Sequence, residues 1–131
     1  MKKILVTLLL VATSPLQGRD YYEVYYQNLW HSLSGGQTEV VFEDRTRCDI
    51  LTETHAIEVD FADKWAEAVG QAAHYATLTG KRAGILLIIE DASDFKYLLR
   101  LENLIEYHNL EIDVWTILSP DLLPNTSTSH E

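Results

Sequence analysis

Segments with the apolar spacing of strands and of helices follow one another along the chain. Strands are predicted for residues 38–42, 48–52, 55–61, 83–89 and 111–118. Helices are predicted for residues 20–33, 64–78 and 94–109, where apolar residues recur every three to four positions. The predicted order is therefore α-β-β-β-α-β-α-β, which indicates an α/β fold with a mixed sheet flanked by helices.

Local signals refine this order. Polar turns of two to five residues join the first three strands, which favours an antiparallel meander. Residues 83–89 form a continuous apolar run, which is typical of a central strand buried on both faces. Asp20 and Asp63 stand where N-caps of the first and second helices are expected. We expect the first helix to bury an aromatic and aliphatic stripe. That stripe comprises Tyr22, Tyr25, Tyr26, Leu29 and Leu33.

The two ends of the chain differ from its middle. Residues 1–18 have a basic start, a short apolar run and a small polar end, which is the layout of a secretory signal peptide cleaved after Gly18. As a helix the apolar run would be about 14 Å long, too short to span a bilayer core of about 30 Å. A buried first strand is the alternative for this segment. We therefore expect an exported protein, periplasmic or secreted, with one domain over residues 19–119 and a flexible tail over residues 120–131.

Size and charge restrict the possible functions. A chain of 131 residues forms one core. Its formal net charge is -10, and loss of the two positive charges of Lys2 and Lys3 would make it -12. Such a surface has no long-range attraction for phosphate backbones, which weighs against a non-specific DNA-binding protein. An enzyme that reverses the sign locally, with a bound cation and nearby Lys or Arg, remains compatible. The single cysteine, Cys48, cannot form an internal disulfide and is expected to be buried.

Acidic residues gather on one face of the strand predicted over residues 55–61. Alternation places Glu58 and Asp60 on the same face of that strand. Asp49 precedes Glu58 by an interval of eight residues and lies on the neighbouring strand, so we expect the two to approach across the sheet. Carboxylates suit Mg²⁺ or Mn²⁺, which keep several waters and take one or two protein carboxylates. Such a cation acidifies a bound water and stabilises charge on a phosphodiester during cleavage.

The following helix adds three polar side chains on one edge. Lys64, Gln71 and Tyr75 are separated by seven and four residues, which places them within about 40° of one another around the helix. A lysine at the start of this edge could orient the attacking water or the scissile phosphate. Gln and Tyr could bind the backbone of a substrate. Taken singly, each of these residues is also compatible with an ordinary helix surface.

These elements and residues together resemble the PD-(D/E)xK nuclease superfamily. The resemblance covers about residues 39–89 and is carried by Asp49, by Glu58-Val-Asp60 and by Gln71-Ala-Ala-His-Tyr75, in that order. It implies a restriction-endonuclease-like α-β-β-β-α-β core and nuclease activity, with nucleic acid as the partner.

The resemblance also implies roles for individual residues. In the family, the first Asp and the following acid bind the divalent cation, which here falls on Asp49 and Glu58. Several members carry a QxxxY motif on the next helix, which matches Gln71 and Tyr75. Some members also use an upstream Glu, for which Glu39 is the candidate.

The chain departs from the family pattern at one position. Where the family has a lysine, two residues after the acid, this chain has Asp60. Some lineages take the lysine from the neighbouring helix, and Lys64 is suitably placed for that role. Asp60 would then be a further metal ligand or a neighbour of the ligands. We therefore expect metal-dependent phosphodiester hydrolysis. The alternatives are a non-catalytic relative that binds a partner outside the cytoplasm, and a simple solvated strand face at Glu58 and Asp60.

Overall fold

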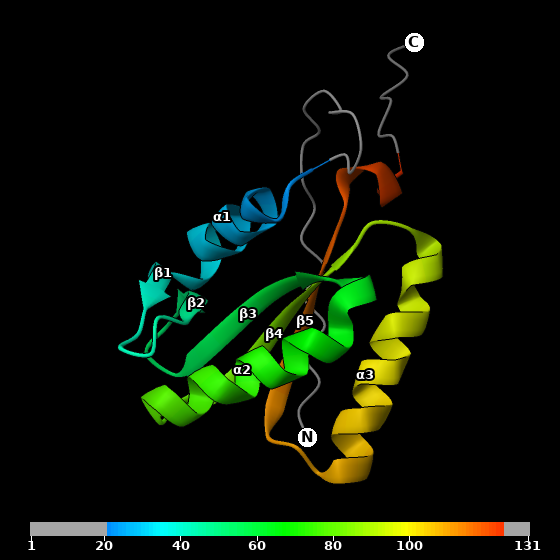
Figure 1. The fold of residues 1–131 in the computed structure, drawn as a ribbon. Helices are drawn as coiled ribbons and strands as arrows, with labels where there is room; N and C mark the ends of the chain where they lie inside the picture. Colours follow the sequence, from blue (N-terminus) through cyan, green and yellow to red (C-terminus); the bar gives the residue numbers. More distant parts are fainter. Residues whose placement is uncertain (1–20, 125–131) are drawn as a thin grey trace.

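A computed structural model describes residues 21–124 of the chain. The predictions of a signal peptide over 1–18 and of a tail beyond residue 124 lie outside these residues. The elements in order are α1 (Glu23–Ser34), β1 (Gln37–Val41), β2 (Arg47–Leu51), β3 (His55–Phe61), η1 (Ala62–Lys64), α2 (Trp65–Thr79), β4 (Arg82–Ile89), η2 (Ala92–Asp94), α3 (Phe95–His108), β5 (Ile112–Leu118) and η3 (Pro120–Leu122) (Figure 1). The predicted order of helices and strands is confirmed.

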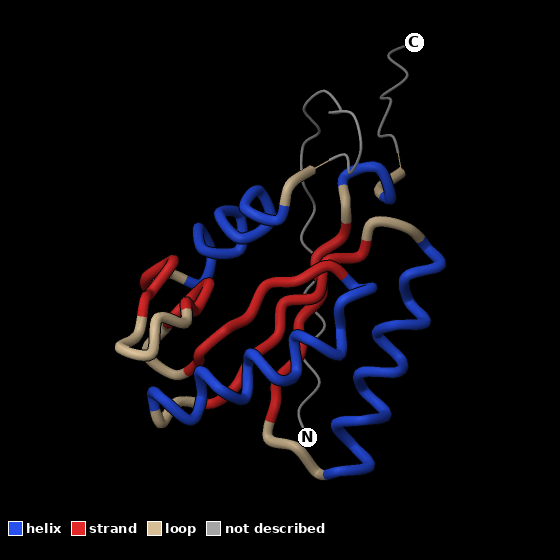
Figure 2. Tube along the Cα trace, viewed as in Figure 1, coloured by secondary structure: helices blue, strands red, loops and turns tan. Residues whose placement is uncertain are grey.

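One sheet of five strands forms the centre of the fold (Figure 2). Its strand order is β1-β2-β3-β4-β5, the order of the chain. The short turns make β1, β2 and β3 antiparallel neighbours, as predicted. The α2 and α3 connections then bring β4 parallel to β3 and β5 parallel to β4. The structure thus confirms an α/β fold with a mixed sheet flanked by helices.

Helices cover both faces of this sheet (Figure 1). On one face α1 packs against a core that includes Tyr26, Val59 and Phe61. On the other face α2 and α3 pack against a core that includes Ala72 and Leu101. Strand β3 alternates between the faces, so its apolar residues meet α1 and its acidic residues point towards α2.

The first helix differs from the sequence prediction at both ends. Tyr22 and Leu33 are 63% and 59% exposed, and the buried residues of α1 are Tyr26, Gln27 and Trp30. Tyr22 is the N-cap and precedes the first turn, while only the middle of the helix packs on the sheet. The predicted stripe was therefore correct at its centre and wrong at its ends.

Two further boundaries differ from prediction. Asp63 does not cap α2, because Ala62–Lys64 form a 3₁₀ turn and α2 begins at Trp65. The domain also extends past residue 119. Pro120–Leu122 form a 3₁₀ turn in which Pro120 is buried, and the Ser119 hydroxyl accepts a hydrogen bond from the Asp121 N–H at 3.4 Å. The predicted tail was therefore wrong for these three residues.

Candidate functional site

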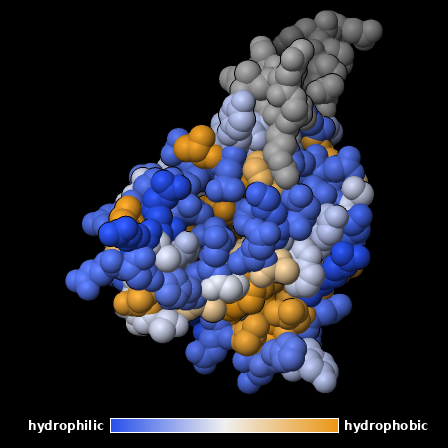
Figure 3. Space-filling model, in the orientation of Figure 1, coloured by the Kyte–Doolittle hydropathy of each residue, from blue (hydrophilic) through white to orange (hydrophobic). Residues whose placement is uncertain are grey.

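A cleft of about 650 Å³ lies between the β1–β2 turn, the start of α1 and the helix α2. Of the seven predicted site residues, all but Glu39 line this cleft. Its lining consists of Glu23, Val41, Arg45, Thr46, Arg47, Asp49, Glu58, Asp60, Lys64, Glu67, Gln71 and Tyr75. The face seen in Figure 3 is hydrophilic between α1 and α2, whereas hydrophobic residues gather between α2 and α3.

Asp49 and Glu58 form the floor of the cleft, where they are only 7% and 6% exposed. The antiparallel register pairs Ile50 with Ile57, and its continuation places Asp49 opposite Glu58. Directly opposite residues point to the same face of a sheet. Asp49 Oδ2 accepts a hydrogen bond from the Val59 N–H at 2.8 Å, which fixes its orientation. The two acids predicted to meet across the sheet therefore do meet.

Ionisation of both carboxyl groups of this pair is strongly disfavoured. Burial, followed by the proximity of Asp49, raises the pKa of Glu58 to about 10. Burial also raises the pKa of Asp49, although the Val59 N–H and a hydrogen bond from Glu58 oppose that shift. Without a metal, Glu58 is therefore protonated at neutral pH, and its hydroxyl donates a hydrogen bond to the Asp49 carboxylate. The other oxygen, Glu58 Oε2, is buried and has no hydrogen-bond partner among residues 21–124. A buried acid pair of this kind requires a proton or a cation for neutrality.

Asp60 and Lys64 lie beside this pair. Asp60 is 5% exposed, and burial raises its pKa to about 6. The Phe61 N–H, which donates to Asp60 Oδ1 at 3.0 Å, and the Lys64 ammonium both oppose this shift. Lys64 ends the 3₁₀ turn after β3, and its exposed side chain lines the cleft. The structure therefore places a lysine near the acids. It stands one helical turn after Asp60, the position at which the PD-(D/E)xK pattern has its lysine.

Glu23 is a cleft residue that the sequence analysis missed. It stands in the first turn of α1, and burial raises its pKa to about 7. Asp49 and Asp60 contribute to this increase, whereas Lys64 opposes it, so Glu23 belongs to the same electrostatic cluster. Glu23 and Gln27 are one helical turn apart, a spacing that could have indicated a polar face on α1.

Glu39, the predicted upstream acid, lies outside the cleft lining. Both of its oxygens have partners: Oε1 accepts a hydrogen bond from Gln27 Nε2 at 3.0 Å, and Oε2 is 2.6 Å from Arg47 Nε. Its charge still contributes to the raised pKa of Asp49. The upstream glutamate that lines the cleft is Glu23.

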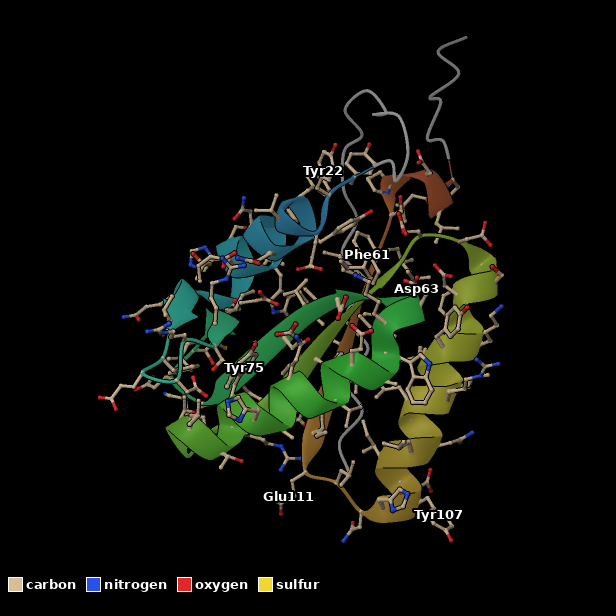
Figure 4. The ribbon with its side chains drawn as sticks, in the orientation of Figure 1. Tyr22, Phe61, Asp63, Tyr75, Tyr107 and Glu111 are labelled. Atoms are coloured by element: carbon tan, nitrogen blue, oxygen red, sulfur yellow. The ribbon has the colours of Figure 1, made fainter. Side chains whose placement is uncertain are left out.

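The walls of the cleft carry the remaining polar groups. Gln71 and Tyr75 line it from α2, as the helical spacing predicted. Burial, followed by the nearby acids Glu58 and Asp49, raises the pKa of Tyr75 to about 12, so its hydroxyl keeps its proton. Tyr75 lies on α2 (Figure 4). The centroid of its ring is 5.9 Å from that of Phe42, at the start of the β1–β2 turn. That turn supplies Arg45, which the sequence analysis had assigned no role.

These residues limit how a metal ion could be held. No group of three or more His, Cys, Asp or Glu side chains within residues 21–124 is arranged to hold a metal ion. A cation here would therefore depend on the Asp49 and Glu58 pair, with water or substrate oxygens as its other ligands. Mg²⁺ is commonly bound in this way. The buried, unpartnered Oε2 of Glu58 is a suitable hard oxygen ligand.

Comparison of the chain with protein-family models, with curated proteins and with solved structures gives no match. Within residues 21–124, no helix has both the length and the apolar character required to cross a bilayer.

Proposed function

We propose that the cleft hydrolyses phosphodiester bonds with a divalent cation, Mg²⁺ or Mn²⁺, held by Asp49 and Glu58. One observation carries this proposal. Two nearly buried carboxyl groups face each other at the floor of a cleft, their raised pKa values favour a proton between them, and Glu58 Oε2 has no hydrogen-bond partner within the described residues. Replacement of that proton by a cation would neutralise both acids and satisfy the free oxygen.

The surrounding side chains suit phosphodiester chemistry. When bound, the cation would acidify a water and stabilise charge on the phosphate. Lys64 would orient the water or the scissile phosphate, with Asp60 beside it to hold the ammonium in place. Gln71 and the protonated Tyr75 hydroxyl would donate hydrogen bonds to the substrate backbone. Because Asp49, Glu58, Gln71 and Tyr75 all line the cleft, we infer that the protein is related to PD-(D/E)xK nucleases and has their restriction-endonuclease-like core.

A second candidate is a non-catalytic binding module on the same fold. Two observations favour it: Asp60 occupies the position of the family lysine, and the chain carries a formal charge of -10. For the nuclease and for the binding module alike, the basic and apolar residues 1–18 support export, to the periplasm or beyond.

Substitution of Lys64 with Met separates the two candidates. If Lys64 positions water or phosphate, Lys64→Met should cleave labelled single-stranded oligonucleotides at least about 10²-fold more slowly than the wild type in Mn²⁺. The increase in melting temperature produced by Mn²⁺ should be retained, because Lys64 is not a metal ligand. The measurement is the single-turnover cleavage rate together with the thermal melt.

The matched control is Lys96→Met, because Lys96 is exposed on α3, outside the cleft. This variant should cleave at the wild-type rate. A Lys64→Met protein that cleaves as fast as Lys96→Met would contradict the proposed role of Lys64. A wild-type protein that Mn²⁺ stabilises but that cleaves no oligonucleotide would favour the binding module.

A further inference from the structure

We propose that this cleft accepts a single nucleic-acid strand or a free strand end, and that it excludes internal phosphodiesters of a duplex. This inference rests on the proposed function and names its substrate class. Three features of the described residues support it: the depth of the acids, the walls of the cleft and the distribution of positive charge.

Depth is the first feature. The carboxyl groups of Asp49, Glu58 and Asp60 are all less than 10% exposed, so a scissile phosphate must enter the cleft to reach them. The volume of about 650 Å³ is that of a small-molecule pocket, within the usual range of about 300–1,000 Å³. A duplex is stiff over about 150 base pairs and cannot push one internal phosphate into such a pocket without deformation. A flexible strand can do so.

The β1–β2 turn forms a wall that is attached to α2 at two points. Asp44 Oδ2 lies 2.6 Å from His74 Nε2 on α2, and the Phe42 ring packs against Tyr75. The other oxygen, Asp44 Oδ1, accepts hydrogen bonds from the Thr46 N–H at 3.0 Å and the Thr46 hydroxyl at 2.6 Å. These contacts hold Arg45 and Thr46 at the edge of the cleft. The turn and α2 are therefore joined on this side of the cleft, which leaves a substrate to enter past the start of α1, where Glu23 lies.

Positive charge is concentrated at the cleft. Residues 21–124 contain seven Lys and Arg side chains, of which Arg45, Arg47 and Lys64 line the cleft. Of the other four, Arg82 is paired with Asp113 at 2.6 Å, Lys81 donates a hydrogen bond to the Glu53 carbonyl at 2.7 Å, and Lys96 and Arg100 lie over the Tyr97 ring on α3. A duplex-binding protein needs a series of phosphate contacts along its surface. The cations outside the cleft lie near Glu53 and Asp113 or on α3, so within residues 21–124 they form no series of contacts that leads along the surface to the cleft.

The charges within the cleft also imply that substrate and cation bind together. The lining has five carboxyl groups, those of Glu23, Asp49, Glu58, Asp60 and Glu67, against three cationic side chains. Even with one proton on the Asp49 and Glu58 pair, the three cations do not outnumber the remaining carboxyl groups, so the cleft offers a polyanion no net attraction until a divalent cation is present. We therefore expect strand binding to require the cation.

Fluorescence anisotropy with three labelled probes tests this inference. The probes are a 12-nucleotide single strand, a blunt duplex of the same sequence, and a closed circular duplex without free ends or unpaired loops, all with Ca²⁺ as the cation. The single strand should bind at least about tenfold more tightly than the closed duplex, and EDTA should abolish binding. With three phosphate contacts, the slope of log K against log salt should be about -2 for the single strand. Equal affinity for the closed duplex would overturn the inference.

Arg45→Gln and Arg100→Gln are the matched variants for the same assay. Arg45→Gln should weaken strand binding several-fold and reduce the salt slope by about 0.7, because one phosphate contact is lost. Arg100→Gln lies outside the cleft and should change neither quantity. Equal effects of the two variants would overturn the inference. Thermal melts show whether each variant is folded.

Cleavage assays in Mn²⁺ separate this inference from the proposed function. If the single strand binds as expected and no probe is cut, the proposed function fails while the binding preference stands. If covalently closed plasmid is nicked as fast as the single strand is cut, the proposed function stands and the preference is overturned.

Discussion

Glu58→Gln is expected to reduce the rate of Mn²⁺-dependent phosphodiester cleavage by about 10³-fold, equivalent to about 4 kcal/mol of transition-state stabilisation. The amide has the shape of the protonated carboxyl and can still donate a hydrogen bond to Asp49. It lacks the negative charge that would hold the cation. Since the pKa of Glu58 is raised to about 10, the wild-type side chain is already neutral at pH 7 without metal, and the variant should fold normally.

Single-turnover kinetics over a Mn²⁺ titration provide the measurement. The matched control is Glu67→Gln, because Glu67 lines the same cleft from the exposed face of α2. This control should remain within a few-fold of the wild-type rate. If Glu58→Gln were as active as Glu67→Gln, the cation would not depend on Glu58.

The second large effect concerns stability without metal. In EDTA, the free energy of unfolding should fall as the pH rises from about 5 to about 9. Glu58 keeps its proton in the folded protein up to a pKa of about 10 but loses it near 4.5 when unfolded. Within this interval the folded state binds one more proton, so stability is greatest at low pH and falls by up to about 1.4 kcal/mol per pH unit. Glu23 and Asp60, with pKa values raised to about 7 and about 6, add to the lower part of the interval.

Urea unfolding at each pH, in EDTA, measures this dependence. Glu58→Gln should give a flatter curve between pH 7 and 9, because the side chain no longer titrates. Saturating Mn²⁺ should also flatten the wild-type curve, since the cation replaces the proton. The Glu67→Gln protein should retain the wild-type slope. An unchanged slope in Glu58→Gln would show that the proton is not held by the Glu58 and Asp49 pair.

Much of the fold could be predicted because its signals are local. The predicted strand over residues 55–61 coincides with β3, and the short turns before it determine the antiparallel pairing. Errors occurred where tertiary contacts decide burial. The aromatic residues of α1 repeat every three to four positions, yet only the middle of the helix reaches the sheet. For this reason Tyr22 and Leu33 are exposed.

The residues of the candidate site likewise fall into two groups: those that local rules predicted and those that only the fold reveals. Asp49 and Glu58 could be placed together from strand pairing, and Gln71 and Tyr75 from helical spacing, because both rules act over a few residues. Glu23 could not be identified. It reaches the cleft because α1 packs against the end of β3, where Tyr26 contacts Phe61. No local sequence rule links two segments so far apart in the chain. Arg45 was missed because a charged turn reads as solvated surface until the fold shows which cleft it borders.

A crystal of the protein soaked in Mn²⁺, with anomalous diffraction data, tests the central claim most directly. We expect one anomalous peak within bonding distance of a carboxylate oxygen of Asp49 and of Glu58, at the floor of the cleft. Soaked crystals of Glu58→Gln should lack this peak. The absence of a peak between Asp49 and Glu58 in the wild type, at millimolar Mn²⁺, would contradict the claim that these two acids share a cation.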